Sequence, residues 1–354
     1  MSLGISRRRI LMMTVVGACF TPALAQSPTS IARVDGAVLP VPCRTIGLRQ
    51  ASADADVRIV VTAIAADPQG KLLAVAGDDH KIRILDTSTL AVTRTLSVHR
   101  DLIRTLAFDR SGRRLVSAGN DGQLILWDRQ HEFREIQKIQ GTPALACVCF
   151  SPDGSKLAAV GFDNEVFILS QADHRRPVFQ CDCQDLRAVA YRDDNRVLAV
   201  AGRSGDLHLF DPENGQLLGD HRLHQGRIHG VAFHSDTELV VCVGEDGAVT
   251  VFDSQHQQLR HRISVTTGKL FAVTVIDSQR VAVAGSDNEI RIVNTDRGQI
   301  ESTLEGHQGT VATLAANGST LFSGGFDATL KRWSIGSLPP SRQRIAEVDP
   351  RLDR

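Results

Sequence analysis

Short apolar runs separated by turn-forming residues dominate the chain, and residues 103–139 show the pattern most clearly. The runs read IRTLAF, RRLVSAG, QLILWD and FREIQKI, with the turns DRSG and NDG between the first three. Glycine tolerates positive φ, and Asp or Asn side chains hydrogen-bond to nearby backbone, so both connections have the chemistry of tight turns. The pattern therefore predicts four short β-strands in this segment.

The same four-strand pattern recurs along the chain. A marker residue, Asp in all copies but one, precedes each third strand, and successive markers are 42, 42, 41, 42, 41 and 40 residues apart. The markers are Asp79, Asp121, Asp163, Ser204, Asp246, Asp287 and Asp327. A glycine stands two residues before every marker, and an apolar residue, twice Trp, stands six residues after it. Self-similarity at a fixed period of this length indicates seven copies of one supersecondary unit.

The strands are apolar on both faces, which limits how the seven units can be arranged. A sheet with one wet face alternates apolar and polar residues, whereas runs such as LAAVG at 157–161 do not alternate. Each sheet must therefore be covered on both sides by its neighbours, and four-stranded sheets arranged radially form a β-propeller. The predicted fold is all-β, a seven-bladed propeller of four-stranded antiparallel blades over residues 43–337.

The last unit has only three strands before Pro339 and Pro340, whose missing backbone donors oppose further pairing. Residues 43–49, CRTIGLR, align with TRTLSVH at 93–99, which includes the fourth strand of the first unit. We therefore predict that this N-terminal strand completes the last blade and closes the ring. The connection that follows it is longer than its counterparts, and Asp54 and Asp56 are expected to project from one face.

Two dipeptides make the resemblance to a known family specific. Trp127-Asp128 and Gly306-His307 match the W-D and G-H signatures of WD40 repeats, and residues 43–334 resemble that family. The resemblance implies a buried, hydrogen-bonded tetrad of the G-H histidine, a second-strand Ser or Thr, the marker Asp and the third-strand Trp. We call this tetrad a latch and expect a structural role for it, not a catalytic one. Two units match at every position, with His99, Ser117, Asp121 and Trp127, and with His307, Ser323, Asp327 and Trp333.

The first 25 residues have the pattern of a secretory signal peptide. Three arginines at 7–9 precede an apolar stretch at 10–20, and an A-x-A cleavage site follows at 23–25. We expect export by the Sec or twin-arginine route and a mature periplasmic chain that begins at Gln26. The apolar stretch is shorter than the roughly 20 residues of a membrane span, and a lipid anchor at Cys19 is the less favoured alternative. Residues 26–42 are expected to form a leader and residues 338–354 a polar tail.

Charge and motif content argue against several function classes. The 40 Lys and Arg residues balance 40 Asp and Glu residues, and a net charge of zero argues against a nucleic-acid partner. The sequence contains no P-loop, no G-x-S-x-G nucleophile motif and no H-E-x-x-H zinc motif. We therefore expect neither enzymatic activity nor a cofactor.

Two groups of residues could in principle bind a metal ion, and we expect that neither does. The first is the histidine-rich segment 221–234, in which His224 occupies a latch position and the other histidines face different ways. The second consists of the C-x-C pairs 147/149 and 181/183, placed on the innermost and outermost strands of the third blade. Residues two apart on a strand pair poorly as disulfides. Inert buried thiols are the favoured interpretation, and a copper-like thiolate site is the alternative.

The family resemblance also implies a partner surface on the top face, which we define as the rim made by residues just before each first strand and just before each marker. Phe162 and Phe326 lie at turn positions with no packing reason for an aromatic residue, and exposed aromatics and arginines dominate binding energy at interfaces. We predict a monomeric scaffold that binds protein through Phe162, Phe326, Arg203, Arg227, Lys269, Leu102, Asp78 and Asn120. In a competing account, both Phe side chains fold inward against neighbouring blades. The alternative function is an exported enzyme or small-ligand binder that uses the central channel.

Overall fold

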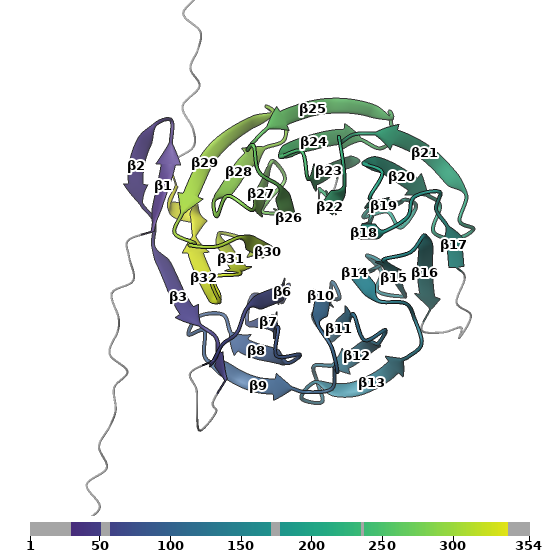
Figure 1. Ribbon diagram of the computed structural model, residues 1–354, viewed down its shortest axis with the longest axis horizontal. Coiled ribbons are helices and arrows are strands. Elements are labelled where there is room, and N and C mark those ends of the chain that lie inside the picture. The colour runs from purple at the N-terminus through teal and green to yellow at the C-terminus, as the bar shows by residue number, and fades with distance from the viewer. Residues whose placement is uncertain (1–29, 51–56, 171–177, 235–236, 339–354) are drawn as a thin grey trace, which may run out of the picture.

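Four-stranded sheets repeat seven times around a central axis (Figure 1). The computed structural model describes residues 30–50, 57–170, 178–234 and 237–338. The prediction of an all-β, seven-bladed propeller is confirmed. The expected signal peptide with Cys19, the segment with Asp54 and Asp56, and the tail from residue 339 lie outside the described residues.

The strands of each blade run outward from the channel in chain order, except that the seventh blade takes its outermost strand from the N-terminal part of the chain. The innermost strands are β6 (Val61–Ala66), β10 (Ile103–Phe108), β14 (Leu145–Phe150), β18 (Leu186–Tyr191), β22 (Ile228–Phe233), β26 (Leu270–Val275) and β30 (Val311–Asn317). The second strands are β7 (Leu72–Gly77), β11 (Arg114–Gly119), β15 (Lys156–Gly161), β19 (Leu198–Gly202), β23 (Leu239–Gly244), β27 (Arg280–Gly285) and β31 (Thr320–Gly325).

The outer half of each blade is less buried towards its edge. The third strands are β8 (Ile82–Asp86), β12 (Leu124–Asp128), β16 (Glu165–Ser170), β20 (Asp206–Phe210), β24 (Ala248–Asp253), β28 (Ile290–Asn294) and β32 (Thr329–Ser334). The outermost strands are β9 (Val92–Leu96), β13 (Arg134–Ile139), β17 (Val178–Gln180), β21 (Leu217–Arg222), β25 (Gln258–Ser264), β29 (Gln299–Glu305) and, in the seventh blade, β3 (Cys43–Gly47). A short sheet of β4 (Arg49–Gln50) and β5 (Val57–Arg58) and a 3-10 turn, η1 (Ile335–Ser337), complete the described elements.

The N-terminal strand closes the ring, as predicted. β3 pairs antiparallel with β32, and the register runs from Cys43 opposite Trp333 to Gly47 opposite Thr329. The seventh blade therefore joins both ends of the propeller in one sheet. The third strand of that blade has no free edge as a result.

The expected leader contains a β-hairpin that the sequence analysis did not predict. β1 (Ile31–Val34) pairs with β2 (Ala37–Pro40) and also with the outermost strand of the sixth blade, β29, so that this blade has six strands. The turn between them is Asp35-Gly36, with φ of 48° and 81°. Both residues adopt the left-handed conformation, for which an Asp-Gly pair is well suited.

The second strands form a buried layer of the fold. Their apolar residues are buried, and those of neighbouring blades join in shared clusters. The glycine that ends each of these strands allows a close backbone approach. A Cβ added at Gly119 would lie 2.2 Å from the Leu102 carbonyl oxygen, and one added at Gly285 would lie 1.8 Å from that of Lys269. In the part of the chain that the structure describes, no helix is long and apolar enough to cross a membrane.

Candidate functional site

The structure brings the four latch residues of the second blade together. The Ser117 hydroxyl lies 2.8 Å from His99 Nε2 and accepts a hydrogen bond from Trp127 Nε1 at 2.9 Å. His99 Nδ1 lies 2.9 Å from a carboxylate oxygen of Asp121. Burial lowers the pKa of His99 although Asp121 opposes the shift, so the imidazole is neutral. A neutral imidazole donates to Asp121 through Nδ1 and accepts from Ser117 through Nε2.

The seventh blade repeats this arrangement. Ser323 Oγ lies 2.7 Å from His307 Nε2 and accepts from Trp333 Nε1 at 2.8 Å, and His307 Nδ1 lies 2.8 Å from Asp327. Ser323 is fully buried. Because the hydroxyl is surrounded by its latch partners, this serine has no route to a substrate. The Ser, His and Asp here stabilise the fold.

The residues that contact the marker differ from blade to blade. In the fifth blade His224 lies 2.8 Å from Asp246 and 3.0 Å from the third-strand Thr250. The first and sixth blades use an ion pair between the marker and an arginine four residues later, Arg83 with Asp79 and Arg291 with Asp287, each at 2.6 Å. In each of these blades the marker carboxylate therefore makes a buried or half-buried polar contact. Its partner is a histidine in the second, fifth and seventh blades and an arginine in the first and sixth.

The histidine-rich segment does not form a single site. His221 packs against Phe252 with ring centroids 4.5 Å apart, and His224 belongs to the fifth latch. His229 faces Phe271 at the channel mouth, whereas His234 lies 3.0 Å from the Thr295 hydroxyl on the adjacent blade. The four side chains are thus distributed over separate environments, in accord with the different faces expected from the sequence.

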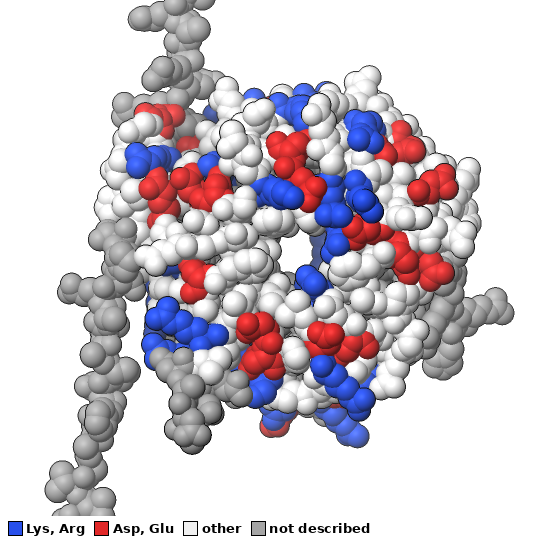
Figure 2. Space-filling model, in the orientation of Figure 1, with Lys and Arg blue, Asp and Glu red and all other residues white. Residues whose placement is uncertain are grey.

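A second cluster surrounds the upper end of the channel. In each blade one residue of the innermost strand is skipped by the pairing with the second strand, which marks a β-bulge. Bulges re-aim side chains. The seven bulge residues are Thr62, Arg104, Ala146, Arg187, His229, Phe271 and Ala312. Figure 2 shows Lys and Arg side chains at the edge of the central opening.

Two of these bulge residues stack on Phe162. The guanidinium carbon of Arg187 lies 4.1 Å from the Phe162 ring centroid, and that of Arg104 lies 5.6 Å from it. Burial lowers the pKa of both arginines, and their positive charges act on one another, since Arg104 and Arg227 further lower the pKa of Arg187. Arg104 donates through Nε to the Asn120 side-chain oxygen at 3.0 Å, and it has no ion-pair partner among the described residues.

A row of ion pairs continues around the rim from Arg187. Asp185 lies 2.7 Å from both Arg187 and Arg227, and Glu245 lies 3.2 Å from Arg227 and 3.1 Å from Lys269. Arg104 and this row together contribute four cationic side chains and two carboxylates to the channel mouth. His229 is 3.5 Å from Glu245, yet burial lowers its pKa to about 4, so it adds no charge at neutral pH.

The residues predicted for the top face are all placed on it, in different states. In six of the seven blades the main-chain amide before the marker donates to the carbonyl before the first strand, as from Asn120 to Leu102 and from Phe326 to Thr310. Phe326 is 62% exposed, whereas Phe162 is half-buried under the two arginines. Asp78 accepts from the Val60 amide, and Arg203 is exposed. Arg227 and Lys269 lie in the ion-pair row and so are not free cations.

Arg104, Arg187, His229 and Phe271 were not predicted from the sequence as residues of the channel mouth. Each of these residues lies between core residues in a first strand, and the adjacent sequence does not mark the bulge. A polar or oversized residue at one fixed position of the first strand, as at Arg104 and Arg187, is the signal that could have found them.

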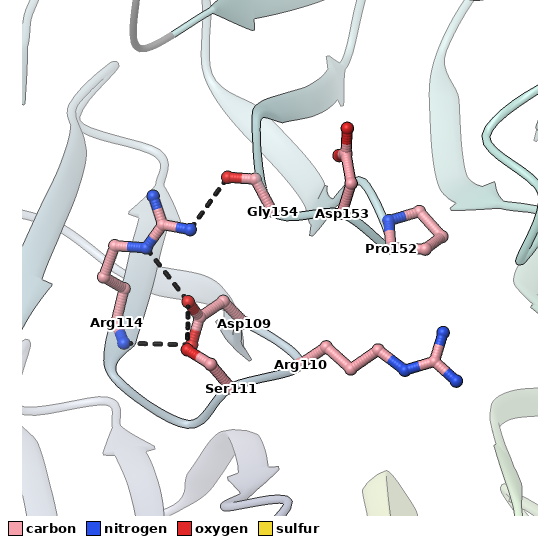
Figure 3. Close-up of a pocket in the computed structure, with 7 residues that line it drawn as sticks. All are labelled: Asp109, Arg110, Ser111, Arg114, Pro152, Asp153 and Gly154. Carbon is pink, nitrogen blue, oxygen red and sulfur yellow. Dashed lines mark hydrogen bonds and ion pairs between the residues drawn. The ribbon is translucent and has the colours of Figure 1, made fainter.

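A polar pocket of about 330 Å³ lies between the second and third blades, away from the channel mouth (Figure 3). Its charged groups are used internally. Arg114 donates to Asp109 at 3.0 Å and to the Gly154 carbonyl oxygen at 2.8 Å, and Asp153 is held by Ser151 and Ser155. The pocket walls are therefore fixed by their own hydrogen bonds, and we assign no function to it.

Comparison with known proteins supports the assignment of the repeats. The family model "WD domain, G-beta repeat" matches residues 53–86, 91–128 and 133–169, and the model "Outer membrane protein assembly factor BamB" matches residues 184–329. The chain is 21% identical over 281 residues to a "Periodic tryptophan protein 2 homolog" of Caenorhabditis elegans, an alignment that covers 78% of this chain and 26% of the relative.

Shorter alignments reach higher identity. A "WD repeat and SOCS box-containing protein 1" of Danio rerio is 34% identical over 99 residues, covering 27% of this chain and 23% of the relative. A "Probable cytosolic iron-sulfur protein assembly protein CIAO1 homolog" of Caenorhabditis elegans is 30% identical over 112 residues, covering 29% of this chain and 33% of the relative. In these alignments the chain spans only a quarter to a third of each relative. Together with the seven four-stranded blades and their latches, these matches support a WD40-type β-propeller, with the WD40 model itself matching the first three blades.

Proposed function

We propose that this protein is a non-catalytic interaction scaffold in an exported compartment and that it binds a protein partner over the channel mouth of its top face. Resemblance to WD-repeat proteins supports the scaffold role. The observation that carries the choice of surface is the stack of Arg104 and Arg187 on Phe162. It fixes two guanidinium groups at the channel mouth, and arginine and aromatic side chains provide most binding energy at protein interfaces.

The charge of the channel mouth favours an acidic partner segment. In the row from Arg104 to Lys269 four cationic side chains face two carboxylates, and Arg104 has no ion-pair partner among the described residues. A carboxylate from the partner would complete the row on the Arg104 side, where guanidinium groups present paired donors to it. The alternating charges of the remaining row would fix the register of the bound segment.

A binding role fits the latch chemistry better than a catalytic one. The serine, histidine and aspartate groups that could resemble a hydrolytic triad are buried in the second and seventh latches. At the channel mouth, His229 and Glu245 are 3.5 Å apart, and neither contacts a serine or cysteine nucleophile among the described residues.

Capture of a partner from periplasmic extract by the mature chain tests this proposal. Arg104→Ala combined with Arg187→Ala should abolish capture, and Phe162→Ala combined with Arg203→Ala should weaken it. Arg113→Ala combined with Arg134→Ala is the matched control, because both residues are exposed and lie away from the channel mouth, in the β10–β11 turn and on β13. Capture through the arginines should also decrease with salt, since exposed charges are screened within about 10 Å at 0.1 M. Equal capture by the channel-mouth variant and the control would exclude this surface.

The exported location has its own test. The basic, apolar and A-x-A segments of residues 1–25 support cleavage before Gln26. N-terminal sequencing of the protein from a periplasmic fraction should give Gln26 as the first residue. Recovery of the chain with Met1 in a cytosolic fraction would contradict export, and a lipidated Cys19 would replace the free periplasmic form with an anchored one.

A further inference from the structure

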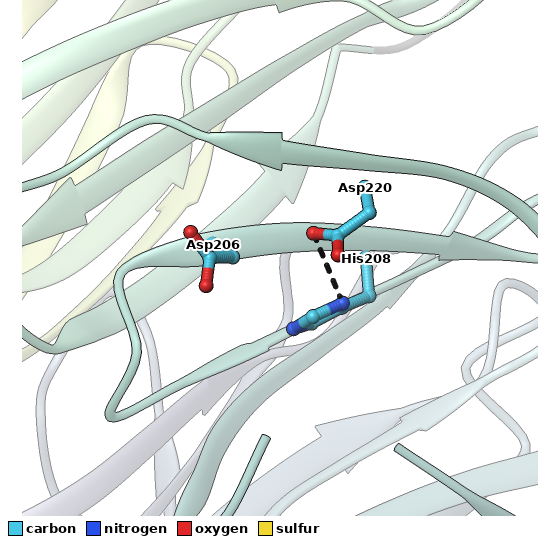
Figure 4. Close-up of side chains that lie close together, drawn as sticks. All are labelled: Asp206, His208 and Asp220. Atoms are coloured by element: carbon cyan, nitrogen blue, oxygen red, sulfur yellow. Dashed lines mark ion pairs between the residues drawn. The ribbon is translucent and has the colours of Figure 1, made fainter. Parts of the chain in front are cut away.

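The third and outermost strands of the fourth blade carry three polar residues on one face. Asp206 and His208 are two residues apart on β20, so their side chains leave the sheet on the same side. Asp220 of β21 lies directly opposite His208 in the antiparallel register. Ligand atoms of the three side chains all lie within 4.8 Å of one another (Figure 4). Two hydrogen-bonded strands therefore hold an imidazole and two carboxylates close together.

The pair of positions occupied by His208 and Asp220 contains an arginine or lysine in five other blades. The opposed residues there are Arg83 and Thr95, Ile125 and Lys138, Thr250 and Arg262, Arg291 and Thr303, and Lys331 and Thr45. The fourth blade also lacks the marker Asp, because its marker is Ser204, whose hydroxyl lies 3.1 Å from Cys183 at the position of the latch histidine. The carboxylates of this blade therefore lie beside an imidazole instead of at the marker.

The imidazole is buried, and one of its nitrogens is unused. His208 is 3% exposed. Its Nδ1 lies 3.3 Å from an Asp220 carboxylate oxygen, the contact dashed in Figure 4, whereas Nε2 has no hydrogen-bond partner among the described residues. In Figure 4 the Nε2 end of the ring points towards Asp206. Buried polar atoms without a partner are uncommon in folded proteins, and this one faces a carboxylate that can bind the same cation.

The two carboxylates connect the buried imidazole to solvent. The Asp220 side chain is 53% exposed, and among the described residues His208 is its one ion-pair partner. Asp206 is half-buried and lies 3.5 Å from the guanidinium group of Arg222, which is 65% exposed. A long ion pair to an exposed arginine is weak. A cation can therefore enter beside Asp220, and Arg222 can turn into solvent when Asp206 binds the cation.

We propose that Asp206, His208 and Asp220 bind a divalent first-row transition-metal ion, with one imidazole nitrogen and one oxygen of each carboxylate as ligands. Ions of this class accept imidazole and carboxylate together, whereas Mg²⁺ and Ca²⁺ prefer oxygen alone. Metal–ligand distances of about 2.0–2.2 Å place two ligand atoms about 3–4 Å apart. A small rotation of the exposed Asp220 side chain is enough to reach that spacing. The site does not rest on the proposed function of the top face.

A proton competes with the metal ion for the imidazole. Burial would lower the pKa of His208, but Cys181, Cys183 and Asp220 outweigh it and raise the pKa to about 10. A protonated ring can pair with Asp220 and needs no metal. Metal binding releases that proton to solvent, so direct measurement of metal uptake distinguishes the two states.

Uptake of Co²⁺ by the mature chain without an affinity tag tests the site. One equivalent should bind per chain, and the absorption spectrum should lack a thiolate-to-metal charge-transfer band because no sulfur is a ligand. Asp206→Asn and Asp220→Asn should each weaken binding by at least about 10-fold, since loss of groups that only orient ligands already costs about 10- to 100-fold. The exposed position of Asp220 makes Asp220→Asn safe for the fold.

Two further variants serve as comparisons. Arg222→Ala frees Asp206 and should strengthen Co²⁺ binding by no more than about fivefold, the contribution of an exposed ion pair. Glu289→Gln is the matched control, because Glu289 has the position of Asp206 in the sixth blade and pairs there with Arg291 at 2.7 Å. This control should bind Co²⁺ like the unaltered chain.

Three results would overturn the proposal. Absence of Co²⁺ uptake by the unaltered chain would leave His208 as a protonated partner of Asp220, and this measurement needs no variant to fold. Equal uptake by the unaltered chain, Asp206→Asn and Asp220→Asn would place the ion elsewhere. A thiolate charge-transfer band that disappears in Cys181→Ser would show that the neighbouring thiols bind the metal and the carboxylates do not.

Discussion

The seventh and fourth blades have the same place in the repeat, but the residues at their latch positions and the contacts that these residues make are different. In the seventh blade His307, Ser323, Asp327 and Trp333 satisfy one another at 2.7–2.8 Å. In the fourth blade Cys183 and Ser204 keep one contact at 3.1 Å, His208 Nε2 has no hydrogen-bond partner among the described residues, and Phe210 stands where Trp333 donates. The backbone of a blade therefore does not require the tetrad.

The largest effect is expected from Trp333→Ala. Trp333 is fully buried and lies opposite Cys43 of the closing strand, so its loss leaves a cavity at the seam of the ring and removes a donor from Ser323. We expect the free energy of unfolding to fall by about 3–5 kcal/mol, measured by urea denaturation. Phe210→Ala, at the equivalent position of the fourth blade, lacks the hydrogen bond and should cost less. An equal loss in both variants would show that the tetrad adds nothing beyond ring packing.

Removal of the central hydroxyl gives the next largest difference. Ser323→Ala leaves His307 Nε2 and Trp333 Nε1 without partners in a buried site, at a cost of about 1–3 kcal/mol for each unsatisfied group. Ser204→Ala removes one contact to Cys183 and one to the Asp206 amide at the edge of its latch, and about 1 kcal/mol is expected. The test is thermal melting of both variants without added metal. A Ser204 variant as unstable as the Ser323 variant would mean that the fourth latch is a structural equivalent of the others.

The histidine latches should contribute to the pH dependence of stability in the same direction as His229, whose pKa burial lowers to about 4. Burial lowers the pKa of His99 and His224, so the unfolded chain binds more protons than the folded chain below the ordinary histidine pKa of about 6.5. Their contribution is complete above that pH and is lost as the pH falls towards the lower folded values. Denaturation curves should therefore show stability decreasing from pH 7 to pH 5. His224→Gln should make that decrease shallower, and an unchanged slope would contradict a neutral latch imidazole.

The sequence predicted the parts of the molecule that are repeated. The markers, the glycines and the two full tetrads recur at a fixed spacing, and the strand order follows from them. The hairpin of β1 and β2 occurs once, although Asp35-Gly36 between apolar residues was a usable signal. Bulges determine the direction of the Arg104 and Arg187 side chains. A bulge arises from the pairing of two strands, so the residues next to either arginine in the sequence do not mark it. Cys181 and Cys183 were predicted on the outermost strand of the third blade, but β17 ends at Gln180 and both lie in the connection to β18, where the Cys181 amide donates to the Asn164 carbonyl.

The smallest effect is expected just outside the latches, at the residue before each marker. Phe326 precedes Asp327 in the seventh blade and Arg203 precedes Ser204 in the fourth, and both side chains are exposed. Substitution of such residues usually changes stability by no more than about 0.5 kcal/mol. Phe326→Ala and Arg203→Ala should therefore melt close to the unaltered protein, although the latches beside them differ. This outcome would show that the top-face residues, unlike the latch residues, contribute little to stability. Binding residues could then vary without affecting the fold. A melting temperature several degrees lower for Phe326→Ala would instead mean that its ring packs against a neighbouring blade in solution.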